Sequence, residues 1–174
     1  MNDIGAIDLG VLDQASDLVI VARRQPEIST WFGPWATLFP HEVAAAERTI
    51  LFASRFGTLF FLLPDGRCQM LDVFFGELLD AAPDLATLVE FAADLAWQET
   101  YLLAGTVRAL AAAGIVAQGS ECYAIAPHPA AGGPDPWAEA ELDPAAIMVI
   151  EGAAWQGLCV TLLRQARAGR AGGE

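Results

Sequence analysis

Residues 48–76 constrain the fold of this chain more than any other stretch. They hold three runs rich in β-branched and aromatic residues, separated by Gly57 and by a Pro-Asp-Gly turn at residues 64–66. Short strands alternating with glycine-bearing turns are typical of an antiparallel meander. The middle run, residues 58–63, is almost entirely apolar, so both of its faces need cover. We therefore expect the rest of the chain to pair with this strand or to pack against it.

The spacing of apolar residues predicts helices on both sides of a shorter strand region. Two helices are expected within residues 84–113, the first capped by Asp84, with a break near Trp97 and Gly114 just past the end of the second. A last helix is expected over residues 153–167. Its apolar side is expected to carry Trp155, Leu158, Leu162 and Ala166.

Two further segments, residues 121–126 and 146–150, have the pattern of strands. We expect them to join the meander of residues 48–73 in one central, mostly antiparallel sheet covered by helices, which is an α+β fold. Residues 18–21 fit either the end of a helix or a short strand.

A length of 174 residues suits one α+β domain, which we assign to residues 46–168. Residues 1–45 are expected to form a helical and aromatic extension packed on the core, because Trp31 and Trp35 lie there. Residues 169–174 are expected to be a frayed tail.

The charge of the chain excludes direct binding to nucleic acid. Its formal net charge is −13 and every basic residue is arginine, so phosphates would be repelled. Acidity of this kind keeps an alanine-rich protein soluble, and it also suits a basic protein partner. Arg108 and Glu151 interrupt the longest apolar runs, so no membrane helix is expected. No signal peptide is predicted, which makes the cytoplasm the expected location.

Motifs for catalysis or for cofactor binding are missing from the sequence. Cys68, Cys122 and Cys159 are far apart and form no metal-binding pair, and His41 and His128 have no motif partner. We therefore predict a protein that is not an enzyme and needs neither cofactor nor metal. A less favoured alternative is a small-molecule-binding or hydrolytic protein with a cleft at His128 and Cys122.

Several short motifs follow one another along the chain: a Phe-Gly strand, an Asp-Gly turn, a Leu-Asp step, a later glycine, a Cys-Tyr strand and a Pro-x-x-Gly-Gly loop. Their main residues are Phe56, Gly57, Asp65, Gly66, Leu71, Asp72, Gly76, Tyr123, Gly132 and Gly133. In this order they resemble the C-terminal domain of type VI secretion immunity proteins, many of which carry a GAD-like domain in front. The resemblance covers about residues 48–150 and implies a bacterial protein that neutralises a secreted nuclease toxin.

The acidic segment after the Pro-Gly loop is the predicted partner-binding surface. It contains Asp135, Trp137, Glu139, Glu141 and Asp143. Acidic side chains would steer a basic toxin to this surface, and a buried aromatic side chain would anchor it. Trp137 fits equally well as a cap over the loop. A cytosolic interaction or scaffold domain without a toxin partner is the alternative function.

Overall fold

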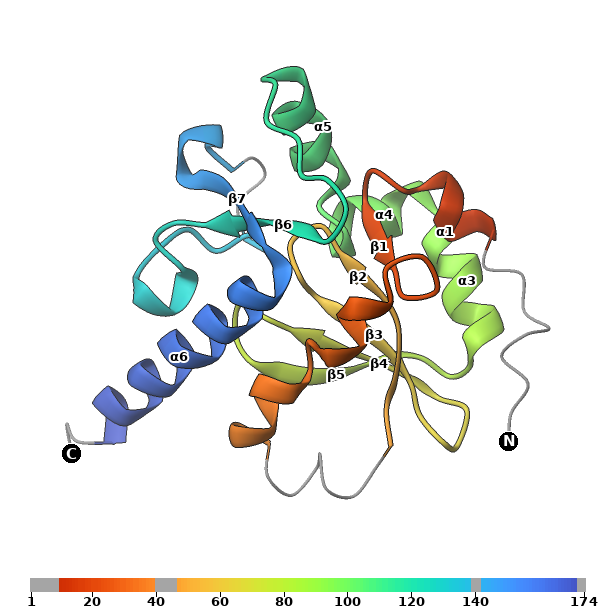
Figure 1. Ribbon diagram of the computed structural model, residues 1–174, viewed down its shortest axis with the longest axis horizontal. Helices are drawn as coiled ribbons and strands as arrows, with labels where there is room; N and C mark the ends of the chain where they lie inside the picture. Colours follow the sequence, from red (N-terminus) through yellow and green to blue (C-terminus); the bar gives the residue numbers. More distant parts are fainter. Residues whose placement is uncertain (1–9, 40–46, 139–141, 172–174) are drawn as a thin grey trace.

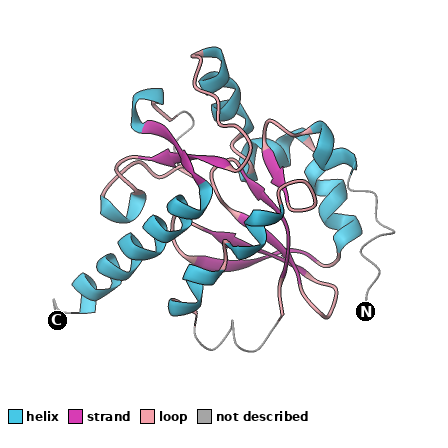
Figure 2. Cartoon of the chain, viewed as in Figure 1, coloured by secondary structure: helices cyan, strands magenta, loops and turns pink. Residues whose placement is uncertain are grey.

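The computed structural model describes residues 10–39, 47–138 and 142–171 (Figure 1). It contains a five-stranded antiparallel sheet, a separate two-stranded sheet and helices around both (Figure 2). The predicted α+β class is therefore confirmed.

The main sheet has its strands in sequence order, β1-β2-β3-β4-β5, and each pairs antiparallel with the next. The strands are β1 (Val19–Val21), β2 (Thr49–Ser54), β3 (Leu59–Leu62), β4 (Cys68–Asp72) and β5 (Glu77–Ala82). The meander is confirmed as β2 to β4. Its second turn closes because Asp65 Oδ1 accepts a hydrogen bond from Arg67 N at 3.1 Å and Gly66 takes a φ of 89°.

The strands β6 (Glu121–Ile125) and β7 (Ile147–Glu151) form the second sheet. The expectation that they join the meander is wrong. β1 occupies the position beside β2 and β5 the position beside β4, so both places next to the meander are taken. β6 instead lies near the end of β2, where Tyr123 N donates a hydrogen bond to the Arg55 carbonyl at 2.7 Å.

The helical stretch predicted at residues 84–113 consists of three helices, which are α3 (Leu85–Ala93), α4 (Leu95–Tyr101) and α5 (Ala104–Ala112). Asp84 caps α3 as predicted, accepting a hydrogen bond from Thr87 N at 2.8 Å. The first break lies at Asp94 and not near Trp97, because Asp94 Oδ1 accepts a hydrogen bond from Trp97 N at 2.8 Å and so caps α4. Gly114 follows α5 with a φ of 79°.

The other helices lie at the two ends of the chain and in its loops. They are α1 (Gly10–Gln14), η2 (Pro26–Thr30), η3 (Gly33–Thr37), η4 (Pro129–Ala131), η5 (Pro144–Ala146) and α6 (Gly152–Ala171). α6 therefore runs past the predicted end at Arg167. No described helix is long and apolar enough to span a membrane. In Figure 1, α1, α3 and α4 lie to the right of the main sheet, while β6, β7 and α6 lie to its left.

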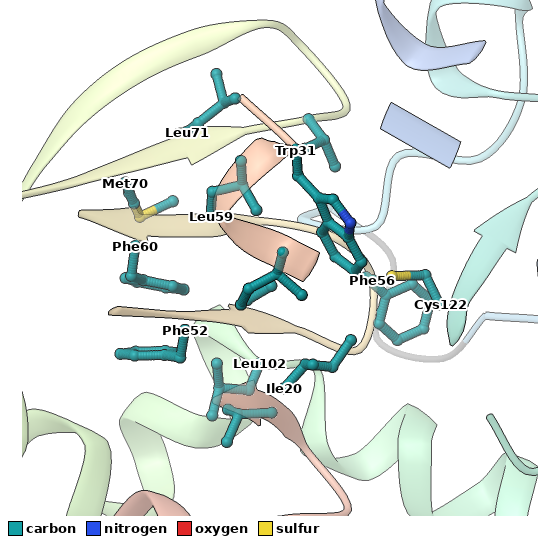
Figure 3. Packing of buried hydrophobic residues seen from close by; sticks show 14 of the residues in the cluster. Ile20, Trp31, Phe52, Phe56, Leu59, Phe60, Met70, Leu71, Leu102 and Cys122 are labelled. Carbon is teal, nitrogen blue, oxygen red and sulfur yellow. The ribbon is translucent and has the colours of Figure 1, made fainter. Parts of the chain in front are cut away.

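One apolar core joins both sheets to the helices. Trp31, which follows η2, and Trp35, in η3, are 1% and 0% exposed, and Figure 3 shows Trp31 beside Phe56 and Cys122. The guanidinium of buried Arg55 donates hydrogen bonds to the carbonyls of Ser16, Gly119 and Glu121. The N-terminal segment and the start of β6 are thereby tied to the end of β2.

Candidate functional site

A groove of about 320 Å³ lies between the α4–α5 corner and the segment that carries Trp137. Its lining includes Glu99 from α4, Leu103 from the corner and Thr106 from α5, with Pro136 and Trp137 opposite. The groove combines an aromatic ring, apolar side chains and a carboxylate, which is the composition of many recognition sites.

The corner between α4 and α5 is built on a residue in an unfavourable backbone conformation. Leu103 has φ 53° and ψ 44°, the left-handed region, where a residue other than glycine is strained by about 1–3 kcal/mol. Its side chain is only 9% exposed, so apolar burial offsets the strain. The left-handed turn separates α4 from α5, and the start of α5 lines the groove.

The carboxylate of Glu99 closes the same corner from outside. Its Oε2 accepts a hydrogen bond from Gly105 N at 2.7 Å, and its Oε1 pairs with the guanidinium of Arg108. Arg108 and, to a smaller degree, the Gly105 amide hold the pKa of Glu99 below its usual value. Glu99 thus stays ionised at the rim of the groove.

Trp137 is held rigidly on the other wall. Its Nε1 donates a hydrogen bond to Asp72 Oδ2 at 2.9 Å, and its backbone N donates to Asp135 Oδ1 at 2.9 Å. Its ring meets Phe74 edge-on, with the ring centroids 5.8 Å apart. Trp137 therefore lines the groove while its indole is fixed to the end of the meander, and its role in partner binding stays a prediction.

Asp72, from the Leu-Asp step, links the meander to this wall. It is 4% exposed, and its Oδ1 accepts hydrogen bonds from Phe74 N at 2.8 Å and Phe75 N at 3.4 Å. Burial raises the pKa of Asp72, while these hydrogen bonds and the one from Trp137 act in the opposite direction. Leu71, the other residue of the Leu-Asp step, is fully buried in the core.

The Pro-Gly loop is shaped by close backbone contacts. Gly132 follows η4 with a φ of 86°, and a Cβ on Gly133 would lie 1.7 Å from the Pro127 carbonyl oxygen. His128 caps η4, because its Nδ1 accepts a hydrogen bond from Ala130 N at 3.0 Å. The Pro127–Gly133 loop therefore requires both glycines for its shape.

The Phe-Gly motif is where α6 attaches to the meander. Trp155 Nε1 donates to the Phe56 carbonyl at 2.8 Å, and Gln156 Nε2 donates to the Gly57 carbonyl at 2.8 Å. Gln156 Oε1 accepts a third bond, from Trp35 Nε1 at 2.7 Å. All of these side chains are buried, so the amide of Gln156 joins η3, the β2–β3 turn and α6.

Two more motif residues make long-range hydrogen bonds. The Tyr123 hydroxyl donates to the Ile115 carbonyl at 3.2 Å and accepts a bond from Ala117 N at 3.1 Å. The Gly76 carbonyl accepts a bond from Arg167 at 3.0 Å. These contacts hold the connection before β6 and the far part of α6 in place.

The structure brings together only part of the predicted binding surface. Trp137 lines the groove, and Asp135 accepts the hydrogen bond from its backbone N. Asp143 instead caps η5, where its Oδ1 accepts a hydrogen bond from Ala145 N at 2.9 Å. Glu139 and Glu141 lie outside the described residues.

Three groups that shape these sites were not recognised from the sequence. Glu99 and Leu103 read as ordinary helix residues, and no structural role was predicted for Gln156. α6 in fact buries Trp155, Gln156, Cys159, Val160 and Leu163, while Leu158 is 42% exposed. Trp155 is buried as predicted, whereas Leu158 is exposed and Leu162 and Ala166 are only half-buried, so the predicted apolar side of α6 is correct at its first residue and wrong at Leu158.

The residues of the hydrolytic alternative are poorly placed for chemistry. Cys122 is fully buried and His128 is 3% exposed. Burial raises the pKa values of Cys122 and Cys159, and it raises that of Cys68 to about 11, so these thiols stay protonated near neutral pH. Among the described residues, no group of three or more His, Cys, Asp or Glu side chains could hold a metal ion.

No protein-family model matches the chain, and a search of curated proteins found no match. The resemblance to type VI secretion immunity proteins stays a prediction.

Proposed function

We propose that this chain is a non-catalytic immunity protein, which binds a basic secreted nuclease toxin in the bacterial cytoplasm and covers its active site. The observation that carries this proposal is the groove beside Trp137, whose aromatic wall is fixed by Asp72, Asp135 and Phe74. An aromatic side chain held rigidly beside a groove loses little entropy on binding and suits an anchor.

Charge supports a basic partner. The chain has a formal net charge of −13, and Glu99 and Asp135 lie at or beside the groove. A nuclease is basic around its active site because it binds phosphate. Attraction between the two surfaces would raise the association rate towards about 10⁸–10⁹ M⁻¹s⁻¹ at low salt.

Co-expression with a basic nuclease encoded by a neighbouring gene tests this function. We expect the chain to restore growth of cells that make the toxin. Thr106→Arg places a bulky cation in the groove without touching the contacts of Trp137, and we expect it to abolish rescue. Thr161→Arg, at an exposed position of α6, is the matched control. This variant should rescue growth fully.

Equal rescue by both variants would remove the groove from the interface. Growth inhibition that persists with the unchanged protein, although both proteins are made, would favour the alternative of an interaction domain without a toxin partner.

A further inference from the structure

The main sheet ends in an outer strand that is largely exposed. β5 pairs with β4 on one side, and in the described part of the chain no strand pairs with its other side. Glu77, Leu79 and Asp80 are exposed, and Leu78 and Ala81 are half-buried. An outer strand of this kind leaves backbone N–H and C=O groups free to pair with another strand.

An apolar row crosses the sheet and reaches the surface at β5. Phe52 pairs with Phe60 and Phe60 with Met70, and Figure 3 shows the three side chains one above the other across the strands. Met70 pairs in turn with Leu79, so Leu79 continues the same face. The exposed fraction rises from 1% for Phe52 to 4% for Met70 and 40% for Leu79. A further strand would continue this buried row.

Partly exposed aromatic side chains lie beside the end of the row. A hollow of about 240 Å³ is lined by Met70, by Phe91 of α3 and by Trp97 and Tyr101 of α4. Phe91 is 39% exposed and Tyr101 37%. Aromatic groups around a hollow provide the contact area that interface anchors use.

The charges around β5 select the kind of strand that can pair with it. The exposed carboxylates on β5, on α3 and at its two ends are Glu77, Asp80, Asp84, Glu90 and Asp94. Among the described residues, Arg67 lies 3.6 Å from Asp80 and Arg167 donates a hydrogen bond to the Gly76 carbonyl before β5, so the carboxylates outnumber these cations. A second copy of β5 would set carboxylates against carboxylates, which destabilises a strand pair, whereas lysine or arginine would be attracted.

We propose that β5 binds an extended segment of a basic protein as a sixth strand of the main sheet. Main-chain hydrogen bonds to β5 give affinity, and alternate side chains give specificity. Apolar residues of the segment cover Leu79 and the hollow beside it, and basic residues lie on the opposite face, where Asp80 is. The partner class is therefore a protein with a strand that alternates apolar and basic residues.

This surface is distinct from the groove beside Trp137. The two lie on opposite sides of α4, because Trp97 and Tyr101 line the hollow whereas Glu99 lines the groove. Strand binding at β5 does not rest on toxin inhibition, and either can fail without the other.

The probe for this surface is a short fluorescein-labelled peptide that alternates lysine with valine. We expect it to bind the full chain and to slow amide hydrogen exchange in β5 by about tenfold or more, because exposed amides become hydrogen-bonded. The same peptide with N-methyl groups on alternate residues keeps its side chains but loses the donors of one edge. It should not bind.

Leu79→Lys tests the strand itself, because a cation on this face interrupts the apolar row that the peptide's valines are expected to cover. We expect it to weaken binding by about tenfold or more. Leu158→Lys on α6 is the matched control, since Leu158 is 42% exposed and Leu79 is 40% exposed. The control should bind as the unchanged protein does.

Three results would overturn the assignment. They are equal binding of the N-methylated peptide, unchanged affinity of Leu79→Lys, and protection from exchange that leaves β5 unaffected. A dimer in sedimentation that Leu79→Lys disrupts would show that β5 pairs with a second copy, and it would also overturn the assignment to a basic partner.

Discussion

At the scale of single residues, the fold depends on positions where no side chain fits. A Cβ on Gly152 would lie 2.1 Å from Trp31 Cζ2 and 2.6 Å from the Ser120 carbonyl oxygen. We expect Gly152→Ala to destabilise the protein by about 1–3 kcal/mol, because Trp31 and the start of α6 must shift. Urea unfolding followed by tryptophan fluorescence measures the change.

Gly157→Ala is the matched control for Gly152→Ala. Gly157 lies on the same helix and has no atom within 4 Å of the added Cβ. This substitution should stabilise the protein by about 0.5–1 kcal/mol, since alanine favours a helix interior over glycine. The same sign for both substitutions would contradict the described packing of α6 on Trp31.

His128 gives the protein a sensitivity to mild acid. Burial lowers its pKa below the ordinary 6.5, although the nearby Val73 carbonyl acts in the opposite direction. Below pH 6.5 the unfolded chain therefore takes up a proton that the folded protein does not, and stability falls as the pH drops towards the lowered pKa. Above 6.5 His128 is neutral in both states and adds no pH dependence.

Unfolding at about pH 7.5 and about pH 5.5 tests this role of His128. We expect the unchanged protein to lose more stability between the two values than His128→Asn, which keeps an acceptor for Ala130 N but does not titrate. An equal loss in both proteins would show that His128 does not cause the acid sensitivity.

At the scale of elements, α6 is attached to the meander through Gln156. Gln156→Leu would leave the Trp35 indole N–H and the Gly57 carbonyl without these bonds in the core. Each unpaired buried group costs about 1–3 kcal/mol, so we expect a loss of about 2–5 kcal/mol in the free energy of unfolding. Calorimetry should show a lower Tm.

Gln165→Leu, on the exposed side of the same helix, is the control for Gln156→Leu. It should change stability by less than about 0.5 kcal/mol. A comparably small effect of Gln156→Leu would mean that apolar contacts alone hold α6 on the meander.

Local sequence patterns predicted the elements better than their partners. The meander followed from its turn glycines, and the start of α3 followed from Asp84, because these residues act on their own neighbours. β1 and β5 pair with the meander, and β6 and β7 form a sheet of their own. No local sequence signal shows which of these four strands pairs with the meander. Strand pairing depends on competition among distant segments.

The candidate site was partly predictable for the same reason. Asp135 and Trp137 stood out through charge and aromatic character, and Asp72 through its motif. The residues of the opposite groove wall could not be predicted from the sequence. The left-handed conformation of Leu103 is unusual for leucine, and the contact of Glu99 with Gly105 spans a helix break. Such features arise from tertiary packing.

At the scale of the whole molecule, charge should control how fast a basic toxin binds. With a formal net charge of −13, we expect the association rate measured by stopped flow to fall by about tenfold or more from low to high salt. The dissociation rate should change little, because it depends on close contacts. An association rate independent of salt would show that steering by charge plays no part.

The most direct measurement is titration of the neighbouring gene's purified nuclease with this protein while DNA cleavage is followed. We predict that cleavage stops at equimolar protein, and that Thr161→Arg inhibits equally while Thr106→Arg does not. Full cleavage in the presence of excess unchanged protein would contradict the assignment of this chain as the inhibitor of that toxin.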